Sequence, residues 1–293
     1  MMTKKLGRLF LLVASVIAID CDAATAQATP SVVAVTVSPN VTSIASNGST
    51  QFTASVTGLS GTAAVGAGDV ASQLRVLSEK GLLFGHQSVG GQLIAAINDL
   101  LAANAGPEPR MVANARSASA VGTGIWGEFG VGANAYPAGK IDDFVAVMNA
   151  GAGAKVNIAF MKYCYLDFFD STSYWATGNV NTLFAKYKSA MAALRTAHPG
   201  ATIVHFTVPL FTSTETNARR EAYSNLVRST YAGSEPVFDI AIIESTRANG
   251  TRCLDGTGVP ALCPEYTTDG GHLNAAGKGL AARALVRFLA ALP

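Results

Sequence analysis

Two distant segments of the sequence carry side-chain types that together could transfer an acyl group. Ser88 lies in a turn with Gly85 before it and Gly90 after it, and Asp269 lies three residues before His272. A carboxylate at this spacing can accept the N–H of one imidazole nitrogen and leave the other nitrogen free to take a proton from a hydroxyl. The three residue types therefore form a candidate proton relay with Ser88 as nucleophile.

Each segment also has a purely structural interpretation. Serine is a preferred N-cap residue, so Ser88 could simply begin the helix that follows it. Asp269 could cap the last helix, and His272 could be an ordinary surface residue. A serine after the first strand, combined with an Asp-x-x-His segment before the final helix, is far more specific than either feature alone, which favours the catalytic interpretation.

Strand and helix patterns alternate around these segments. A short apolar strand at 81–84 ends just before the Ser88 turn, and a helix at 274–292 follows His272. Such alternation predicts a parallel sheet with right-handed crossovers, whose reactive groups gather beyond the carboxyl ends of the strands. The other predicted strands are 156–161, 201–208 and 237–240, and the other predicted helices are 70–80, 93–101, 141–148, 183–194 and 217–231.

The two segments resemble the first and last sequence blocks of the SGNH/GDSL hydrolase superfamily. The resemblance covers residues 79–292; the last block matches closely, and His-Gln-Ser-Val stands where the first block has Gly-Asp-Ser-Leu. It implies a three-layer α/β/α sandwich with a central parallel sheet, similar to flavodoxin. It also implies that Ser88 is the nucleophile, His272 the general base and Asp269 its orienting carboxylate, with no metal or organic cofactor.

The resemblance also indicates where the oxyanion donors belong. The family uses a Gly after the second strand and an Asn after the third, so Ser88 and Gly132 are expected to donate their backbone N–H groups. The segment 161–167 after the third predicted strand contains no Asn. Asn134 or Lys162 would have to replace that donor, since a lost oxyanion donor costs about 10²–10³ in rate and would leave a slow or inactive enzyme.

Aromatic residues near the expected site could contact a substrate. Tyr165 and Trp175 lie in an acidic, aromatic loop after the third predicted strand, and Trp126 lies in a glycine-rich stretch. Flat aromatic faces suit sugar rings, so we expect Trp126, Tyr165 and Trp175 to bind substrate. The alternative is that these side chains only pack the loops.

The first 28 residues have the pattern of an export signal. Three basic residues precede the apolar run 9–19, which is shorter than the roughly 20 residues of a membrane-spanning helix. Ala26 and Ala28 form an A-x-A cleavage pattern, and an uncleaved anchor is the alternative. We therefore expect a periplasmic or secreted bacterial protein with no stable membrane span after cleavage.

The region between the export signal and the α/β pattern is predicted to form strands. Residues 29–58 contain two runs of alternating apolar and polar residues, which predict a pair of strands. Their amino-acid sequence resembles the first half of a bacterial immunoglobulin-like domain. We expect residues 59–68 to be a linker and residues 69–293 to form the SGNH hydrolase-like domain.

The cysteines and the charge fit this interpretation. Cys253 and Cys263 flank a loop containing Gly and Pro, which predicts a disulfide in an oxidising compartment and leaves Cys164 as a free thiol. Zinc is the alternative, but there is no Cys-x-x-Cys and no paired His nearby. The net charge is only +2, without a basic stripe, so the sequence gives little support for nucleic-acid binding.

These features favour an exported serine ester hydrolase that removes acyl groups from carbohydrate or small esters. A glycan O-acyltransferase using the same three residues is one alternative. A non-catalytic carbohydrate-binding or surface protein is another, because the chain carries the immunoglobulin-like segment and lacks the expected Asn.

Overall fold

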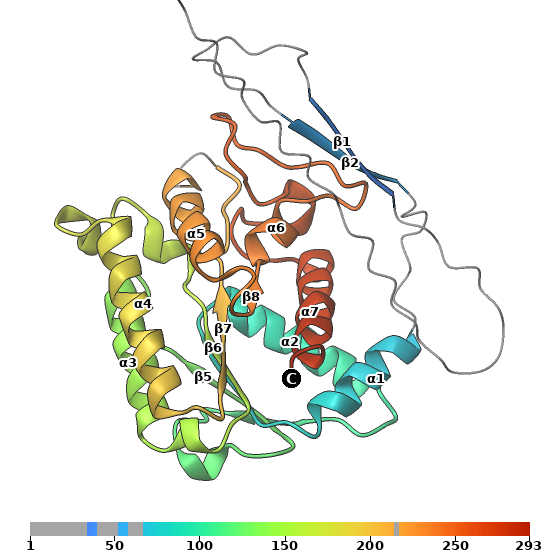
Figure 1. The fold of residues 1–293 in the computed structure, drawn as a ribbon, viewed down its shortest axis with the longest axis vertical. Helices are drawn as coiled ribbons and strands as arrows, with labels where there is room; N and C mark the ends of the chain where they lie inside the picture. Colours follow the sequence, from blue (N-terminus) through green and yellow to red (C-terminus); the bar gives the residue numbers. More distant parts are fainter. Residues whose placement is uncertain (1–33, 40–51, 58–66, 214–216) are drawn as a thin grey trace, which may run out of the picture. The chain divides into compact units, whose positions relative to one another are not determined.

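The computed structural model describes residues 34–39, 52–57, 67–213 and 217–293 (Figure 1). The predicted export signal and residues 59–66 of the predicted linker lie outside the described residues. Strands β1 (Ala34–Pro39) and β2 (Phe52–Thr57) pair in antiparallel fashion, which is the strand pair expected from the alternating sequence. Their assignment to an immunoglobulin-like domain stays a prediction.

A six-stranded parallel sheet forms the centre of the α/β domain. The strand order reverses at β3, because the chain adds strands first on one side of β3 and then on the other. The carboxyl end of the strand at such a reversal is where parallel sheets form ligand sites, and Ser88 follows β3 directly. In spatial order the strands are β4 (Arg110–Ala113), β5 (Ile125–Gly130), β3 (Leu82–His86), β6 (Ile158–Met161), β7 (Thr202–Phe206) and β8 (Val237–Phe238).

Helices cover both faces of this sheet, with α3 and α4 on one side and α1, α2 and α7 on the other (Figure 1). Neighbouring strand residues point to opposite faces, so Phe84 joins the core under α2 and α7 while Leu83 joins the core under α3 and α4. The predicted three-layer α/β/α sandwich is confirmed. The helices are α1 (Ala67–Leu77), α2 (Val89–Ala102), α3 (Pro137–Asn149), α4 (Val180–Ala197), α5 (Asn217–Tyr231), α6 (Ile240–Glu244) and α7 (Ala275–Ala290). Short 3-10 helices are η1 (Ala118–Ala120), η2 (Ala152–Ala154), η3 (Tyr165–Phe168), η4 (Ser173–Ala176) and η5 (Pro264–Tyr266).

The second strand of the sheet departs from the sequence prediction. The stretch around Trp126, interpreted as a glycine-rich loop, is strand β5, and its indole is wholly buried in the core. The predicted role of Trp126 in substrate binding is therefore wrong. Gly127 lies within this strand. A Cβ atom at Gly127 would lie 2.7 Å from the Cβ atom of Ala115, so the glycine permits Ala115 to pack closely on the strand.

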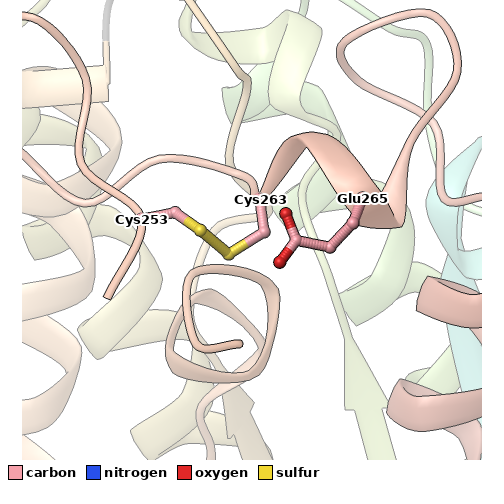
Figure 2. A group of neighbouring side chains, drawn as sticks. All are labelled: Cys253, Cys263 and Glu265. Atoms are coloured by element: carbon pink, nitrogen blue, oxygen red, sulfur yellow. A yellow bond between two sulfur atoms is a disulfide. The ribbon is translucent and has the colours of Figure 1, made fainter. Parts of the chain in front are cut away.

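A disulfide joins Cys253 to Cys263, as predicted, and closes the loop before η5 (Figure 2). Both cysteines are buried, and Cys164 is a buried free thiol. Figure 2 shows the Glu265 carboxylate beside the S–S bond. Because both sulfur atoms are bonded to each other, this cluster offers no pair of thiolates to a metal ion.

Among the described residues, no helix combines the length and the apolar character needed to cross a lipid bilayer.

We predict that replacing Cys253 and Cys263 together by Ser lowers the free energy of unfolding by about 2–3 kcal/mol, because the open loop regains chain entropy in the unfolded state. Urea unfolding followed by circular dichroism measures the difference. Reducing agent should destabilise the wild-type protein and leave the double variant unchanged. Equal unfolding midpoints for both proteins under oxidising conditions would contradict a stabilising disulfide.

Candidate active site

Ser88 occupies a strained turn between β3 and α2. Its backbone has φ 46° and ψ −104°, a positive-φ conformation that non-glycine residues rarely adopt. It stands at the N-cap position of α2, yet its side chain makes no capping hydrogen bond. Its Oγ instead lies 2.5 Å from Nε2 of His272. The interpretation of Ser88 as a simple helix cap therefore does not describe its hydroxyl.

Gly90 allows the Ser88 turn to close on the strand beneath it. A Cβ atom at Gly90 would lie 2.3 Å from the Cβ atom of His86, so the first turn of α2 packs directly on that side chain. His86 is buried, and its Nε2 lies 2.8 Å from Oε2 of Glu128. Burial lowers the pKa of His86 and favours a neutral ring. His86 thus supports the turn and bonds to Glu128 rather than to Ser88.

The imidazole of His272 bridges Ser88 and Asp269. Its Nδ1 lies 2.6 Å from Oδ2 of Asp269, while Oδ1 of the same carboxylate accepts the backbone N–H groups of Gly271 (3.0 Å) and His272 (2.7 Å). These backbone hydrogen bonds, together with the imidazole bond, hold the pKa of Asp269 well below its ordinary value. An ionised Asp269 fixes the proton on Nδ1 and leaves Nε2 to accept the Ser88 proton.

Tyr165 packs against the His272 ring, with its hydroxyl near the nitrogen that faces Asp269. The two ring centroids are 5.4 Å apart in an edge-to-face arrangement, and the phenol oxygen lies 3.4 Å from Nδ1. Gly271 makes room for this contact, because a Cβ atom there would lie 2.5 Å from Tyr165 Cζ. Burial raises the pKa of Tyr165 to about 12, so its hydroxyl stays neutral. The Tyr165 side chain lies beside His272 but is only 5% exposed, which leaves little surface for a substrate.

Trp175 packs within the loop after β6. It lies on η4, its indole N–H donates to the Asp167 carbonyl at 2.9 Å, and its ring faces the guanidinium of Arg219 at 4.7 Å. These are contacts with the protein's own loop and helix α5. These contacts favour loop packing over substrate binding for Trp175.

The expected oxyanion donors differ in their availability. Among the described residues, the backbone N–H of Ser88 has no hydrogen-bond partner, and it lies at the N-terminus of α2, where the helix dipole favours negative charge. The backbone N–H of Gly132 donates to Oδ2 of Asp143 at 2.7 Å, and Arg116 pairs with the same carboxylate. The Gly132 donor is therefore occupied by Asp143 in this arrangement.

Asn134 and Lys162 are the two candidates for the remaining donor. Lys162 is only 1% exposed, and its ammonium donates to the Tyr163 carbonyl at 2.9 Å. Asn134 is exposed, and its Oδ1 accepts from Nζ of Lys140 at 2.9 Å. Among the described residues the Asn134 NH₂ group has no hydrogen-bond partner, whereas the Lys162 ammonium is buried and bonded. Asn134 therefore stays the predicted donor.

A buried ion pair that the sequence did not reveal supports this loop. Lys140 and Asp167 are both fully buried, with Nζ and Oδ2 2.6 Å apart. The Asp167 carboxylate also accepts the backbone N–H groups of Ala135 (2.9 Å) and Cys164 (2.7 Å). The ion pair thus joins the start of α3 to the segment after β6, and the Ala135 hydrogen bond attaches the loop after β5 to the same carboxylate. The sequence offered no signal for it, because Lys140 is seen only as part of a helix start and Asp167 only as part of an acidic loop.

Gln87 connects the Ser88 turn to the loop after β5. Its Nε2 donates to the Gly132 carbonyl at 2.8 Å. In the family block that this segment resembles, an Asp stands at this position. The side chain before Ser88 therefore holds a neighbouring loop in place rather than facing the imidazole.

The fold resembles solved esterase structures at low sequence identity. No family model and no curated protein matches the chain. A Bacteroides fragilis protein provisionally assigned as an acylhydrolase is 15% identical, with a TM-score of 0.45, covering 70% of this chain and 83% of its own. A carbohydrate esterase family 3 protein from Talaromyces cellulolyticus is 14% identical, with a TM-score of 0.40, covering 71% and 94%.

We predict that Lys140→Met destabilises the protein by about 3–5 kcal/mol, because it leaves the Asp167 charge buried without its cation. Thermal and urea unfolding measure the loss. Lys186→Met is the matched control, since Lys186 forms an exposed ion pair with Asp142 that is worth at most about 1 kcal/mol. Equal effects of the two substitutions would show that the buried pair does not hold the loops.

Proposed function

We propose that this chain is a serine ester hydrolase of the SGNH type. Ser88 is the nucleophile, His272 the general base and Asp269 the carboxylate that orients the imidazole. The observation that carries the proposal is the continuous hydrogen-bonded chain from Ser88 Oγ to His272 Nε2, at 2.5 Å, and from His272 Nδ1 to Asp269, at 2.6 Å. Nucleophile, base and orienting group in that order are what acyl transfer through a serine requires.

In the first half-reaction, the acyl group moves to the protein. His272 Nε2 removes the Ser88 proton as Oγ attacks the carbonyl carbon of the ester. The imidazolium that forms is stabilised by the ionised Asp269 carboxylate, which itself stays unprotonated. The imidazolium then gives its proton to the leaving alcohol oxygen, and the acyl group remains on Ser88.

The negative charge of the tetrahedral intermediate needs donors at the Ser88 turn. The unpartnered backbone N–H of Ser88 at the start of α2 is the first donor. The Asn134 amide, held through its carbonyl by Lys140, is the second. Gly132 joins them only if its N–H leaves the Asp143 carboxylate. Each such donor is worth about 10²–10³ in rate.

The second half-reaction releases the acid. The side chain of His272 is 40% exposed, so water can reach Nε2 beside the acyl group. His272 takes a proton from that water as its oxygen attacks the acyl carbonyl, and it returns the proton to Ser88 Oγ as the acid leaves.

Carbohydrate esters or small esters are the proposed substrates. Tyr136 is 55% exposed and lies two residues after Asn134, so it offers an open aromatic face in the loop that carries the proposed donor. A sugar ring can stack on such a face. The predicted export signal and the Cys253–Cys263 disulfide support a periplasmic or secreted location, where acylated glycans are accessible.

We predict that Ser88→Ala lowers kcat for p-nitrophenyl acetate by at least about 10³-fold, because the nucleophile is lost. The melting temperature should change little, since the substitution removes the bond to His272 but no helix cap. Stopped-flow or steady-state absorbance at 405 nm follows the released phenolate.

Ser229→Ala, an exposed serine on α5, is the control and should keep wild-type turnover. Turnover by Ser88→Ala at the wild-type rate would remove the hydrolase proposal. Acetylation of an added glycan in preference to hydrolysis would replace hydrolysis with acyl transfer.

A further inference from the structure

Gln92 links the helix of the proposed nucleophile to the loop of the proposed base. It lies one helical turn after Ser88 on α2, and its backbone N–H donates to the Ser88 carbonyl. Its side-chain Nε2 donates to the Leu273 carbonyl at 2.9 Å, and its Oε1 accepts the Leu273 N–H at 2.8 Å. Leu273 directly follows His272, so one side chain binds both backbone groups of the residue next to the base.

The loop that carries His272 needs an anchor of this kind. The side chains of Asp269 and His272 are 53% and 40% exposed, so packing alone constrains them weakly. The hydrogen bonds inside the loop, such as the Thr267–Leu273 bridge and the Asn274 cap, tie it to itself and to α7. They do not set its distance from α2, where the Ser88 turn begins.

Within the described part of the chain, two side chains of α2 bond to the loop or to α7. Gln92 bonds to Leu273, and Asp99 pairs with Lys278 at 3.3 Å further along the helices. The Asp99–Lys278 pair is exposed, and Lys278 follows His272 by six positions, whereas Leu273 follows it directly. The two links therefore provide a natural comparison between a contact beside the reacting atoms and one that only joins the helices.

We propose that Gln92 is a positioning residue that holds His272 against Ser88 by binding both backbone groups of Leu273. The proposal rests on the proposed function of that same site. A primary amide offers one donor and one acceptor side by side, which matches a backbone C=O and N–H. An ionised carboxylate of the same length can only accept, and a thioether side chain of similar size can replace neither bond.

We call the two hydrogen bonds between Gln92 and Leu273 the Gln92–Leu273 clamp, and we expect its loss to lower the rate of the chemical step. A displacement of reacting groups by about 1 Å can cost about 10²-fold in rate, because the near-attack geometry is lost. Gln92 is placed at Leu273 rather than at the ester, so substrate binding should change little. We expect Gln92→Met to lower kcat by about 10–100-fold and to change KM by less than about threefold.

Gln92→Glu distinguishes a hydrogen-bonding clamp from simple packing. A protonated carboxyl group has one O–H donor and one C=O acceptor and can restore both bonds, whereas the ionised group repels the Leu273 carbonyl. The ratio of variant to wild-type kcat/KM should therefore rise as the pH falls toward the ordinary Glu pKa of about 4.3. The same ratio for Gln92→Met should not change with pH, because methionine has no titrating group.

The experiment measures ester turnover and amide hydrogen exchange on the wild-type protein, Gln92→Met, Gln92→Glu, Ser88→Ala and the control Asp99→Asn. The Leu273 amide should exchange at least about tenfold faster in Gln92→Met than in the wild-type protein, because its acceptor is gone. Asp99→Asn should keep wild-type turnover and Leu273 exchange. Thermal unfolding identifies any variant that fails to fold.

Two failures can be told apart. If turnover depends on Ser88 but Gln92→Met keeps kcat within about twofold of wild type, the positioning role is overturned and the hydrolase remains. The same conclusion holds if the Gln92→Glu ratio does not respond to pH. If turnover does not depend on Ser88 while Leu273 exchange still accelerates in Gln92→Met, the proposed function is wrong and the positioning role for that reaction is overturned with it.

Discussion

The contact between the Ser88 hydroxyl and the His272 imidazole sets the most demanding condition on the packing of the α/β domain. These residues are separated by 184 positions in the chain, yet Oγ and Nε2 lie 2.5 Å apart. That approach requires α2 and α7 to pack side by side on one face of the sheet, so that the start of one helix meets the loop before the other. The core shared by β3, α2 and α7 supplies this packing, and the Ser88 backbone is held in a conformation that an isolated turn would avoid.

The opposite face of the sheet supports the second side of the site. The buried Lys140–Asp167 pair joins the start of α3 to the segment after β6, and the same ammonium binds the side-chain oxygen of Asn134 in the loop after β5. Charges that are buried in this way are costly unless every partner is present, so the geometry of these loops is strongly specified. The Asp143 carboxylate accepts the Gly132 N–H, so this predicted oxyanion donor has a partner within the protein.

The sequence was most informative where local pattern and chemistry coincide. Ser88 and His272 could be selected as candidates because each lies close to a predicted boundary between a loop and a regular element, and Asp269 because of its spacing from His272. The alternating elements predicted the parallel sheet. Strand β5 was not predicted because its glycines are typical of a loop. In the structure, Gly127 permits Ala115 to pack closely on this strand. Trp126 was therefore assigned to substrate binding when it belongs to the core.

The supporting contacts could not be predicted because they join residues that no local pattern connects. Neither the Lys140–Asp167 pair nor the Gln92–Leu273 clamp leaves a trace in hydrophobic periodicity or motif spacing. Both depend on which loops the folded sheet brings together.

Labelling with a fluorophosphonate probe, followed by peptide mapping, tests most directly whether the Ser88 hydroxyl is activated by the imidazole. We expect covalent modification of Ser88 in the wild-type protein and a loss of labelling of at least about 10²-fold in His272→Gln. Absence of label on Ser88 in the folded protein, or equal labelling of the His272→Gln variant, would contradict it.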